Sequence, residues 1–295
     1  MSYIETKIIS LNASDANIDN SSFLSSINFN TTNLYVKDDD VINTYIEVAN
    51  CQIPVSFYII NYTNNLLKFQ SDTDPIETYT IPTGNYNASQ LITLLNTFHT
   101  NLVLTFDKTT GKITFTHNKP FIIYNDFKYS IGNVLGFNSN TINTSVGTSN
   151  PYTLTPPNLL NLMGIKKINI FSSNIEITNY CSNNDGSTSH TSLLAVIPVD
   201  VATYSLINYH NYSNFRTLIK NNSIDNINLQ LKDENNNLIN FNGISYTITL
   251  LLHIERKLKF TDNIPLYNLI DKFNEKEKIN INEPKIKNEL DLLTQ

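Results

Sequence analysis

Hydrophobic and polar residues alternate along much of the chain, with short apolar runs of strand length between turn-forming residues. A period of two is typical of strands that bury one face, and short apolar runs bounded by turns are typical of buried strands. Such segments are SSINFNTTNLYV (25–36), TYIEVANCQIPVSFYIINYT (44–63), KKINIFSS (166–173), LLAVIPV (193–199), INLQLKD (227–233) and YTITLLLHIE (246–255). The sequence therefore predicts a mainly β fold.

One stretch departs from this pattern. YTIPTGNYNASQLITLLN (79–96) begins like a strand and then changes to helical spacing. Asn87 can cap a helix, with Gln90 three residues later able to complete a capping box. The apolar face of this helix is predicted to be Leu91, Leu94, Leu95 and Phe98. Because so short a helix is unstable alone in water, it is expected to pack on the following hairpin, 102–115, whose turn contains Gly111.

The spacing of the strands predicts an antiparallel sandwich. The links between strands are long and uneven, and no alternation of strand and helix occurs, which favours jelly-roll connections over a simple meander. The fold class predicted is a single jelly roll with an inserted small α+β layer. The expected divisions are a polar N-terminal arm (1–25), a jelly roll (26–75 and 160–256), an inserted subdomain (76–159) and a charged C-terminal tail (257–295). The arm and the tail are expected to clamp neighbouring subunits.

Composition narrows the classes of partner. The 295 residues carry a net charge of −6, so the basic excess of a nucleic-acid-binding protein is missing and no specific nucleic acid is expected. No apolar stretch reaches the ~18–20 residues needed to span a bilayer. The first residues lack the pattern of a secretory signal, so synthesis in the cytoplasm is expected. The 47 Asn residues favour turns and long loops.

Candidate chemistry is sparse. The five His residues are scattered, and none stands at metal-ligand spacing from another His or a Cys. His253 and Glu255 share one face of a strand, which favours a cross-strand polar pair over half of a metal site. KDDD (37–40) is interpreted as an exposed loop, with a calcium site as the alternative. Cys51 and Cys181 are interpreted as free thiols. No catalytic, cofactor-binding or metal residue is assigned, no cofactor is expected, and the protein is predicted not to be an enzyme.

A series of short stretches resembles a known family. IPVSFYIINYTNN (53–65), TIPTGNYNASQLITLLN (80–96), LTFDKTTGKITFTH (104–117), IGNVLGF (131–137), LLAVIPV (193–199) and INLQLKDENNNLINFNGISYTITLLLHI (227–254) occur in this order. Together they resemble the penton (minor capsid) proteins of virophages and of related Polinton-like and large DNA viruses, over residues 22–256. Glycine is expected in the closing turn, where this chain has Asn235–Asn237, and Asn tolerates the same left-handed backbone.

The resemblance implies a single jelly roll, often with an inserted domain, whose five copies fill a capsid vertex. The implied partners are further copies of this chain in a homopentamer, the neighbouring major capsid protein, and a host receptor or glycan. The implied location is the virion, after synthesis in the host cytoplasm. The residues of the subunit interface are not located by the resemblance.

Two other functions stay open from the sequence. One is a capsid component beside the vertices, such as a cement protein. The other is a carbohydrate- or receptor-binding β-sandwich module, in which some of the 16 Tyr residues stack on sugar rings and Asn side chains bind hydroxyls. Tyr is equally common in sheets and in subunit interfaces, so its abundance does not separate these alternatives. A measurement of the mass of the protein in solution separates a pentamer from a monomeric binding module.

Overall fold

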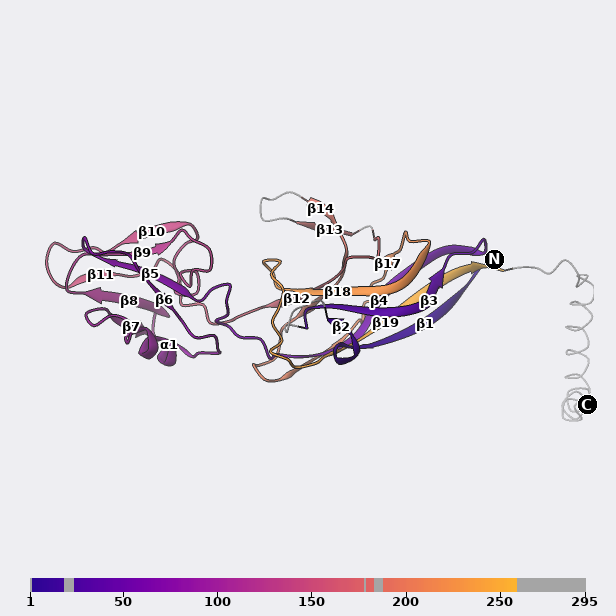
Figure 1. The fold of residues 1–295 in the computed structure, drawn as a ribbon, viewed down its shortest axis with the longest axis horizontal. Helices are drawn as coiled ribbons and strands as arrows, with labels where there is room; N and C mark the ends of the chain where they lie inside the picture. Colours follow the sequence, from indigo (N-terminus) through magenta and orange to yellow (C-terminus); the bar gives the residue numbers. More distant parts are fainter. Residues whose placement is uncertain (1, 19–23, 178, 183–187, 259–295) are drawn as a thin grey trace, which may run out of the picture.

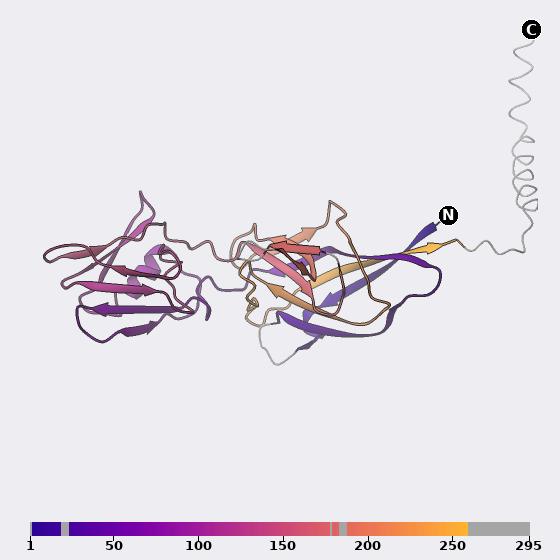
Figure 2. The same cartoon turned by 90° about the horizontal axis from the view of Figure 1, so that it is seen from above.

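The molecule is elongated and has two lobes. The structure, a computed structural model, describes residues 2–18, 24–177, 179–182 and 188–258. The two lobes follow one another along the longest axis (Figures 1 and 2). One lobe holds both the start of the chain and its last described strand, and an internal segment forms the other. Within the described residues, no helix has the length and apolar character needed to cross a membrane.

The first lobe consists of two antiparallel five-stranded sheets. The first sheet has the order β1–β19–β4–β16, with β17 also paired to β4. Its strands are β1 (Ser2–Asn12), β19 (Thr247–Lys257), β4 (Val41–Pro54), β16 (Leu206–His210) and β17 (Thr217–Leu218). The second sheet has the order β15–β12–β18–β3–β2. Its strands are β15 (Leu193–Pro198), β12 (Lys167–Ser172), β18 (Ser223–Lys232), β3 (Ser26–Val36) and β2 (Asn17–Ile18).

The connections between these sheets are those of a jelly roll. Along the chain, the eight main strands of the lobe are β1, β3, β4, β12, β15, β16, β18 and β19. The first pairs with the last (β1–β19), the second with the seventh (β3–β18), the third with the sixth (β4–β16) and the fourth with the fifth (β12–β15). This nesting of pairs places alternate pairs in opposite sheets, as in double-sheet jelly rolls. The predicted mainly β, jelly-roll fold is confirmed.

A buried cluster fills the space between the two sheets. In β19 every second side chain points inward, and Ile248, Leu250, Leu252 and Ile254 are at most 1% exposed. Each such burial contributes ~1.5–3 kcal/mol relative to an exposed side chain. The alternation seen in the sequence is therefore the inward and outward alternation of the sandwich.

The lobe contains two further elements. A short 3-10 helix, Ala13–Asp15, follows β1, and a separate hairpin consists of β13 (Asn179–Ser182) and β14 (Thr188–Thr191).

The second lobe is inserted between β4 and β12, the third and fourth strands of the roll. It contains one helix and two small antiparallel sheets, in the orders β10–β9–β5–β6 and β11–β8–β7. Its elements are β5 (Leu66–Ser71), β6 (Glu77–Thr80), α1 (Ala88–Leu95), β7 (Val103–Asp107), β8 (Lys112–His117), β9 (Phe121–Asn125), β10 (Thr141–Thr144) and β11 (Tyr152–Leu154). A second buried cluster holds these elements together.

The start of α1 agrees with the prediction. The Asn87 side chain accepts a hydrogen bond from the Gln90 backbone N–H, and the Gln90 side chain accepts one from the Asn87 backbone N–H. The turn of the following hairpin places Gly111 in the left-handed region, with φ of 67°. At the other end of the helix, Asn96 binds both backbone groups of Leu104, at 3.1 Å and 2.6 Å. The hydrogen bonds between the Asn96 side chain and the Leu104 backbone thus join α1 to the hairpin on which it packs.

The predicted apolar face of α1 is largely correct. Leu91 and Leu95 are fully buried in the cluster of the second lobe. Leu94 and Phe98 are half-buried at its margin, where the Phe98 ring stacks on Tyr79 with 5.2 Å between the ring centroids. Ile92 is also buried and was not predicted to be. The helix therefore turns its buried face slightly away from the one that spacing predicts.

The limits of the lobes differ from the expected divisions. The buried cluster of the jelly roll runs to Phe57 and resumes at Ile168, and the cluster of the insertion begins at Ile60. Strand β5, expected in the jelly roll, contributes Leu67 and Phe69 to the insertion because it pairs with β9, about 50 residues further on. The alternation within β5 is that of any half-buried strand, so the sequence does not specify its partner.

The N-terminal segment differs from the expected arm, and the closing turn does not join two paired strands. Residues 2–12 form β1, which pairs along its whole length with β19 and buries Ile9 and Leu11. Polar and apolar residues are mixed in β1 without a clear alternation, so the sequence pattern did not predict that it is a strand. The 234–237 turn reverses the chain, but β18 and β19 lie in opposite sheets, and the returning segment makes a single bridge from Leu238 to Lys232. The expected tail lies outside the described residues beyond Leu258.

Candidate assembly surface

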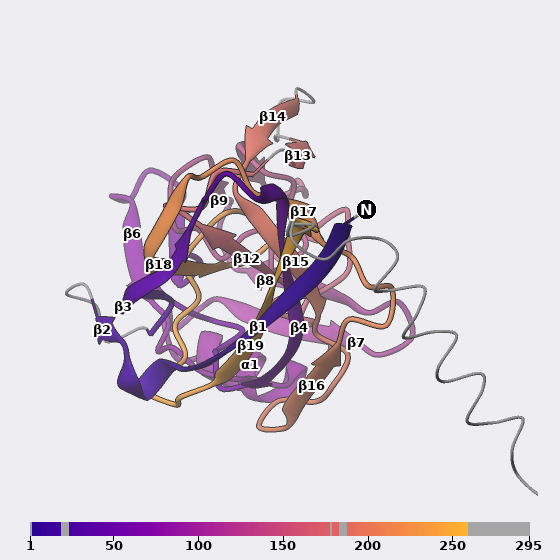
Figure 3. The same ribbon diagram turned by 90° about the vertical axis from the view of Figure 1, so that its right-hand side faces the viewer.

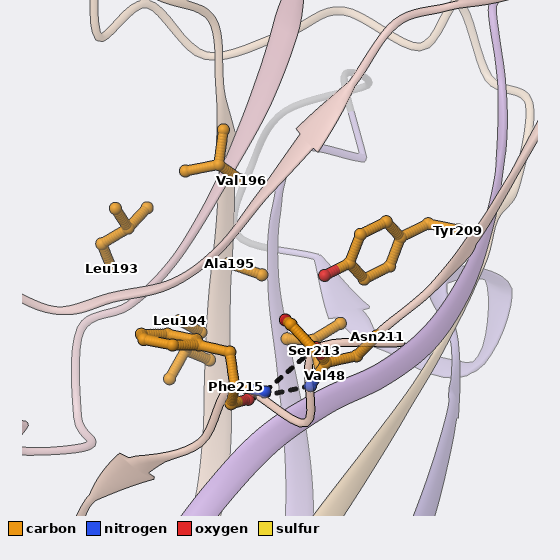
Figure 4. Close-up of a pocket in the computed structure, with 9 residues that line it drawn as sticks. All are labelled: Val48, Leu193, Leu194, Ala195, Val196, Tyr209, Asn211, Ser213 and Phe215. Carbon is orange, nitrogen blue, oxygen red and sulfur yellow. Dashed lines mark hydrogen bonds between the residues drawn. The ribbon is translucent and has the colours of Figure 1, made fainter.

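A groove of about 410 Å³ opens along one flank of the jelly roll. It lies where an edge strand of one sheet, β15, faces an edge strand of the other, β16. The side chains that line it are Val48, Leu193, Leu194, Ala195, Val196, Tyr209, Asn211, Ser213 and Phe215 (Figure 4). None of these residues is charged, and most are apolar, so the groove is suited to apolar contact.

One loop forms the rim of the groove and is held by a single amide side chain. Asn211 follows β16; its Nδ2 donates a hydrogen bond to the Phe215 carbonyl at 2.8 Å, and its Oδ1 accepts one from the Phe215 N–H at 3.1 Å. The Ser213 hydroxyl donates to the same Oδ1 at 3.0 Å. These bonds hold the loop in a closed turn, from which Phe215 lines the groove together with Leu194 (Figure 4). The rim of the groove is therefore formed within the single chain, without a partner.

Tyr209 is the main polar group inside the groove. Its ring comes from β16 and its hydroxyl points into the space (Figure 4). Burial raises the pKa of Tyr209 above its usual value, and the nearby Cys51 and Glu47 add to this increase because their negative forms would repel a phenolate. The hydroxyl therefore stays neutral at physiological pH and can donate a hydrogen bond to a partner.

The flank around the groove exposes further large apolar side chains. Val196 is 44% exposed and Phe215 52% exposed. Tyr204, Leu206 and Tyr212, on and beside β16, are exposed as well. Isolated exposed apolar residues are ordinary, but a group of them around an uncharged groove marks a surface for association. Neither the sequence pattern nor the resemblance predicted this site, because β15 and the 211–215 loop are separate in sequence and meet only in the folded sandwich.

His253 and Glu255 make the cross-strand contacts that their spacing indicates. His253 Nδ1 lies 3.1 Å from the Thr6 hydroxyl on β1, and its Nε2 lies 3.4 Å from Glu47 Oε2 on β4. Glu255 accepts hydrogen bonds from Asn43 and, with a smaller effect, from Ser2, and both lower the pKa of its carboxyl group. Within the described residues, no three His, Cys, Asp or Glu side chains are close enough together to hold a metal ion.

The KDDD segment is part of an ion-pair cluster. Arg256 on β19 donates to Asp38 Oδ2 at 2.7 Å and to Glu5 Oε2 at 2.6 Å. These two hydrogen bonds to carboxylates raise the already high pKa of the guanidinium group. The cluster joins β1, the 37–40 turn and β19 at one end of the first sheet. Asp38 is therefore part of an ion-pair cluster with Arg256.

Cys51 is a buried, unpaired thiol on β4. Burial raises its pKa to about 12, an increase that a hydrogen bond from the Tyr209 backbone only partly opposes. A thiol with this pKa carries almost no thiolate at neutral pH and is a poor nucleophile. The expectation of a free thiol at position 51 therefore agrees with the structure, and the side chain of Cys181 lies outside the part that the structure describes.

Two histidines meet inside the insertion. His117 is 2% exposed and its ring lies 5.1 Å from that of His99. Phe69 and Phe121 also pack against the His117 ring. Burial lowers the pKa of His117, His99 and Lys119 lower it further, and a backbone contact with Lys119 together with the charge of Asp74 partly opposes this. The ring is therefore neutral in the folded insertion at pH 7.

We expect the insertion to lose stability in mild acid because of His117. Its folded pKa is below the unfolded value of about 6.5, so the unfolded chain binds more protons and stability falls as pH drops below about 6.5. Urea unfolding of the wild type and of His117→Phe, between about pH 7 and pH 5, measures this effect. The variant should show a flatter pH dependence. Equal slopes for the two proteins would contradict the assignment.

Comparison with solved structures finds virophage structures among its matches. The structure is similar to that of the mavirus penton protein. That match has 13% sequence identity, covers 86% of this chain and 99% of the mavirus chain, and has a TM-score of 0.44. A chain of the Sputnik virophage structure matches with 13% identity over 86% of this chain and 97% of that one, with a TM-score of 0.39. No protein-family model matches the sequence, and no curated protein does.

Proposed function

We propose that the protein is a structural protein of a viral capsid and that five copies form a ring at its five-fold vertices. The observation that carries this proposal is the placement of the stretches that resemble virophage penton proteins. They lie on both lobes: at the end of β4, on the α1 segment, on β7 and β8, on β15, and on β18 and β19. The resemblance therefore follows the whole architecture and not one common motif.

The shape and surface of the jelly roll support this role. A closed ring of identical copies needs heterologous contacts, in which one surface meets a different surface of the next copy. Obligate interfaces are large and apolar at their centre, commonly above ~2,000 Å² in total. The flank around the groove offers such a centre, since its nine lining residues carry no charge. The other proposed partner is the neighbouring major capsid protein, and the proposed location is the virion.

Imaging of particles that contain the tagged chain tests the proposal. The tag should lie at the five-fold vertices and nowhere else on the shell. Native mass spectrometry of the purified protein should also find a species of five chains, either alone or after addition of the major capsid protein. Density for the tag between the vertices would instead indicate a cement protein, and particles without the chain would exclude a capsid role.

A charge placed in the groove is expected to block assembly. Val196→Asp leaves the isolated chain folded because the side chain is 44% exposed, but it would bury an unpaired carboxylate in a ring. We expect ring formation to weaken by at least about tenfold, equivalent to ~1.4 kcal/mol or more. The matched control is Val103→Asp on β7 of the insertion, where Val103 is 49% exposed. Sedimentation of the two variants measures the difference, and equal assembly would exclude the groove from the interface.

A second candidate function is a carbohydrate- or receptor-binding module. A polar cleft of about 350 Å³ lies between the insertion and the 233–237 turn of the jelly roll. It is lined by many amide side chains, among them Asn61, Asn64, Asn133, Asn161, Asn235 and Asn237. Amides donate and accept hydrogen bonds, which suits sugar hydroxyls. Binding of the purified monomer to a glycan array, lost on Asn133→Leu, would favour this function over the ring.

A further inference from the structure

The groove has a counterpart on the opposite flank of the sandwich. In the first sheet, β16 and β1 are the two edge strands, and in the second sheet β15 and β2 are. The groove lies between β15 and β16, so β1 and β2 belong to the other flank. Figure 3, a view along the long axis, shows β16 and β2 on different sides of the body. The jelly-roll order thus separates the two flanks by the full width of each sheet.

The edge strand β1 presents an uncharged row on its outer face, with two exposed isoleucines. Alternate residues point away from the core, and these are Ile4, Thr6, Ile8 and Ser10. Ile8 is 74% exposed and Ile4 is 56% exposed. Their backbone is held rigidly, since every residue of β1 from Ser2 to Asn12 has a partner on β19. An exposed apolar edge strand attracts other chains and is usually blunted by charges, which this row lacks.

We propose that the groove between β15 and β16 receives the outer row of β1, centred on Ile8, from the next copy of the chain. This inference rests on the proposed function, because it specifies which two surfaces meet in the ring. An open row of copies joined by this contact has one free groove at one end and one free β1 edge at the other, until the ring closes. The same contact then serves every copy.

Three properties favour this occupant over others. Neither the nine groove residues nor the four row residues carry charge, so their contact brings no like charges together. A groove of about 410 Å³ is within the ~300–1,000 Å³ range of ligand pockets, large enough for several aliphatic groups. The Tyr209 hydroxyl inside the groove can bind a hydroxyl such as Thr6 or Ser10, or a backbone carbonyl of the entering strand.

Cross-linking between two differently tagged chains tests the contact. One chain carries Ile8→Cys and the other Val196→Cys, both in a Cys181→Ser background, and the two are co-expressed and treated with a short bismaleimide. Cys51 can remain because it is buried and protonated. The matched control replaces Ile8→Cys with Gln52→Cys, an exposed position on β4, an inner strand of the same sheet. Oligomer mass is measured on the same samples, and assembled particles are used where rings do not form in solution.

The expected result is a five-chain species with an adduct between positions 8 and 196 that joins the two tags. Its yield should exceed that of the Gln52 control by at least about tenfold, because neighbours held together react at a high effective concentration. Five-chain rings without this adduct would overturn the inference while the proposed function stands. Adducts between two Ile8→Cys chains at a higher yield than the 8–196 adduct would also overturn it. Absence of rings in both solution and particles would overturn the proposed function as well.

Discussion

Deletion of residues 2–12 is expected to unfold the jelly-roll lobe. Strand β1 pairs with β19 along its whole length and contributes Ile9 and Leu11 to the core. Each buried side chain is worth ~1.5–3 kcal/mol, and its loss would also expose core residues of β19 that β1 covers. The sum is comparable to the ~5–15 kcal/mol that stabilises a typical folded domain. Without β1 the lobe should lose cooperative folding.

Circular dichroism and thermal unfolding of the truncated chain measure this effect. The control is a chain that ends at residue 258, which retains every described strand and is expected to stay folded but to enter shells less efficiently. The two truncations distinguish the roles of the two termini, which the sequence pattern had predicted to be alike, as clamps on a neighbouring subunit. A truncation of residues 2–12 whose Tm falls by only a few degrees would show that the β1 pairing contributes little.

Leu95→Ala is expected to destabilise the insertion by ~2–5 kcal/mol. Leu95 is fully buried in the core of the second lobe, with Leu91, Leu104 and Phe115 in the same cluster. Truncation would leave a cavity that neighbouring strands cannot fill, because Asn96 ties the end of α1 to β7. The loss should be confined to the insertion, since the jelly roll has its own core.

Urea unfolding followed by near-UV circular dichroism measures the change, with limited proteolysis to show which lobe opens first. Leu94→Ala is the matched control: it has the same chemistry on the same helix, but Leu94 is only half-buried, so a smaller cost is expected. A cost well under ~1 kcal/mol for Leu95→Ala would mean that α1 does not pack on its hairpin as described.

The assembly proposals depend on edges, which are a property of the whole sandwich. An edge strand such as β1 or β15 has one unpaired side, and natural proteins usually protect such edges with charge or cover. Here the edges border an uncharged groove and an uncharged row of residues that includes Ile4 and Ile8. Both features are explained if the edges are covered by neighbouring copies. The Val196→Asp and cross-linking experiments test this explanation from each side.

The sequence by itself determined the local elements of this protein. Alternation predicted β12, β15, β18 and β19, because a strand with one buried face imposes a period of two on its side chains. The capping box at Asn87 and the glycine turn at Gly111 were predicted because both depend on residues only a few positions apart. The jelly-roll class followed from the uneven links, together with the family resemblance.

Only the tertiary structure decided which strands pair and which surfaces result. The polar sequence of β1 is compatible with a free arm, and its place in the sheet depends on β19, more than 230 residues away. Strand β5 belongs to the insertion because of β9, and β18 does not pair with β19 although they are consecutive strands. The groove combines residues from β4, β15, β16 and the 211–215 loop. Long-range pairing depends on the packing of the whole chain. A local pattern of hydrophobic and polar residues shows which face of a strand is buried, but not which strand it pairs with.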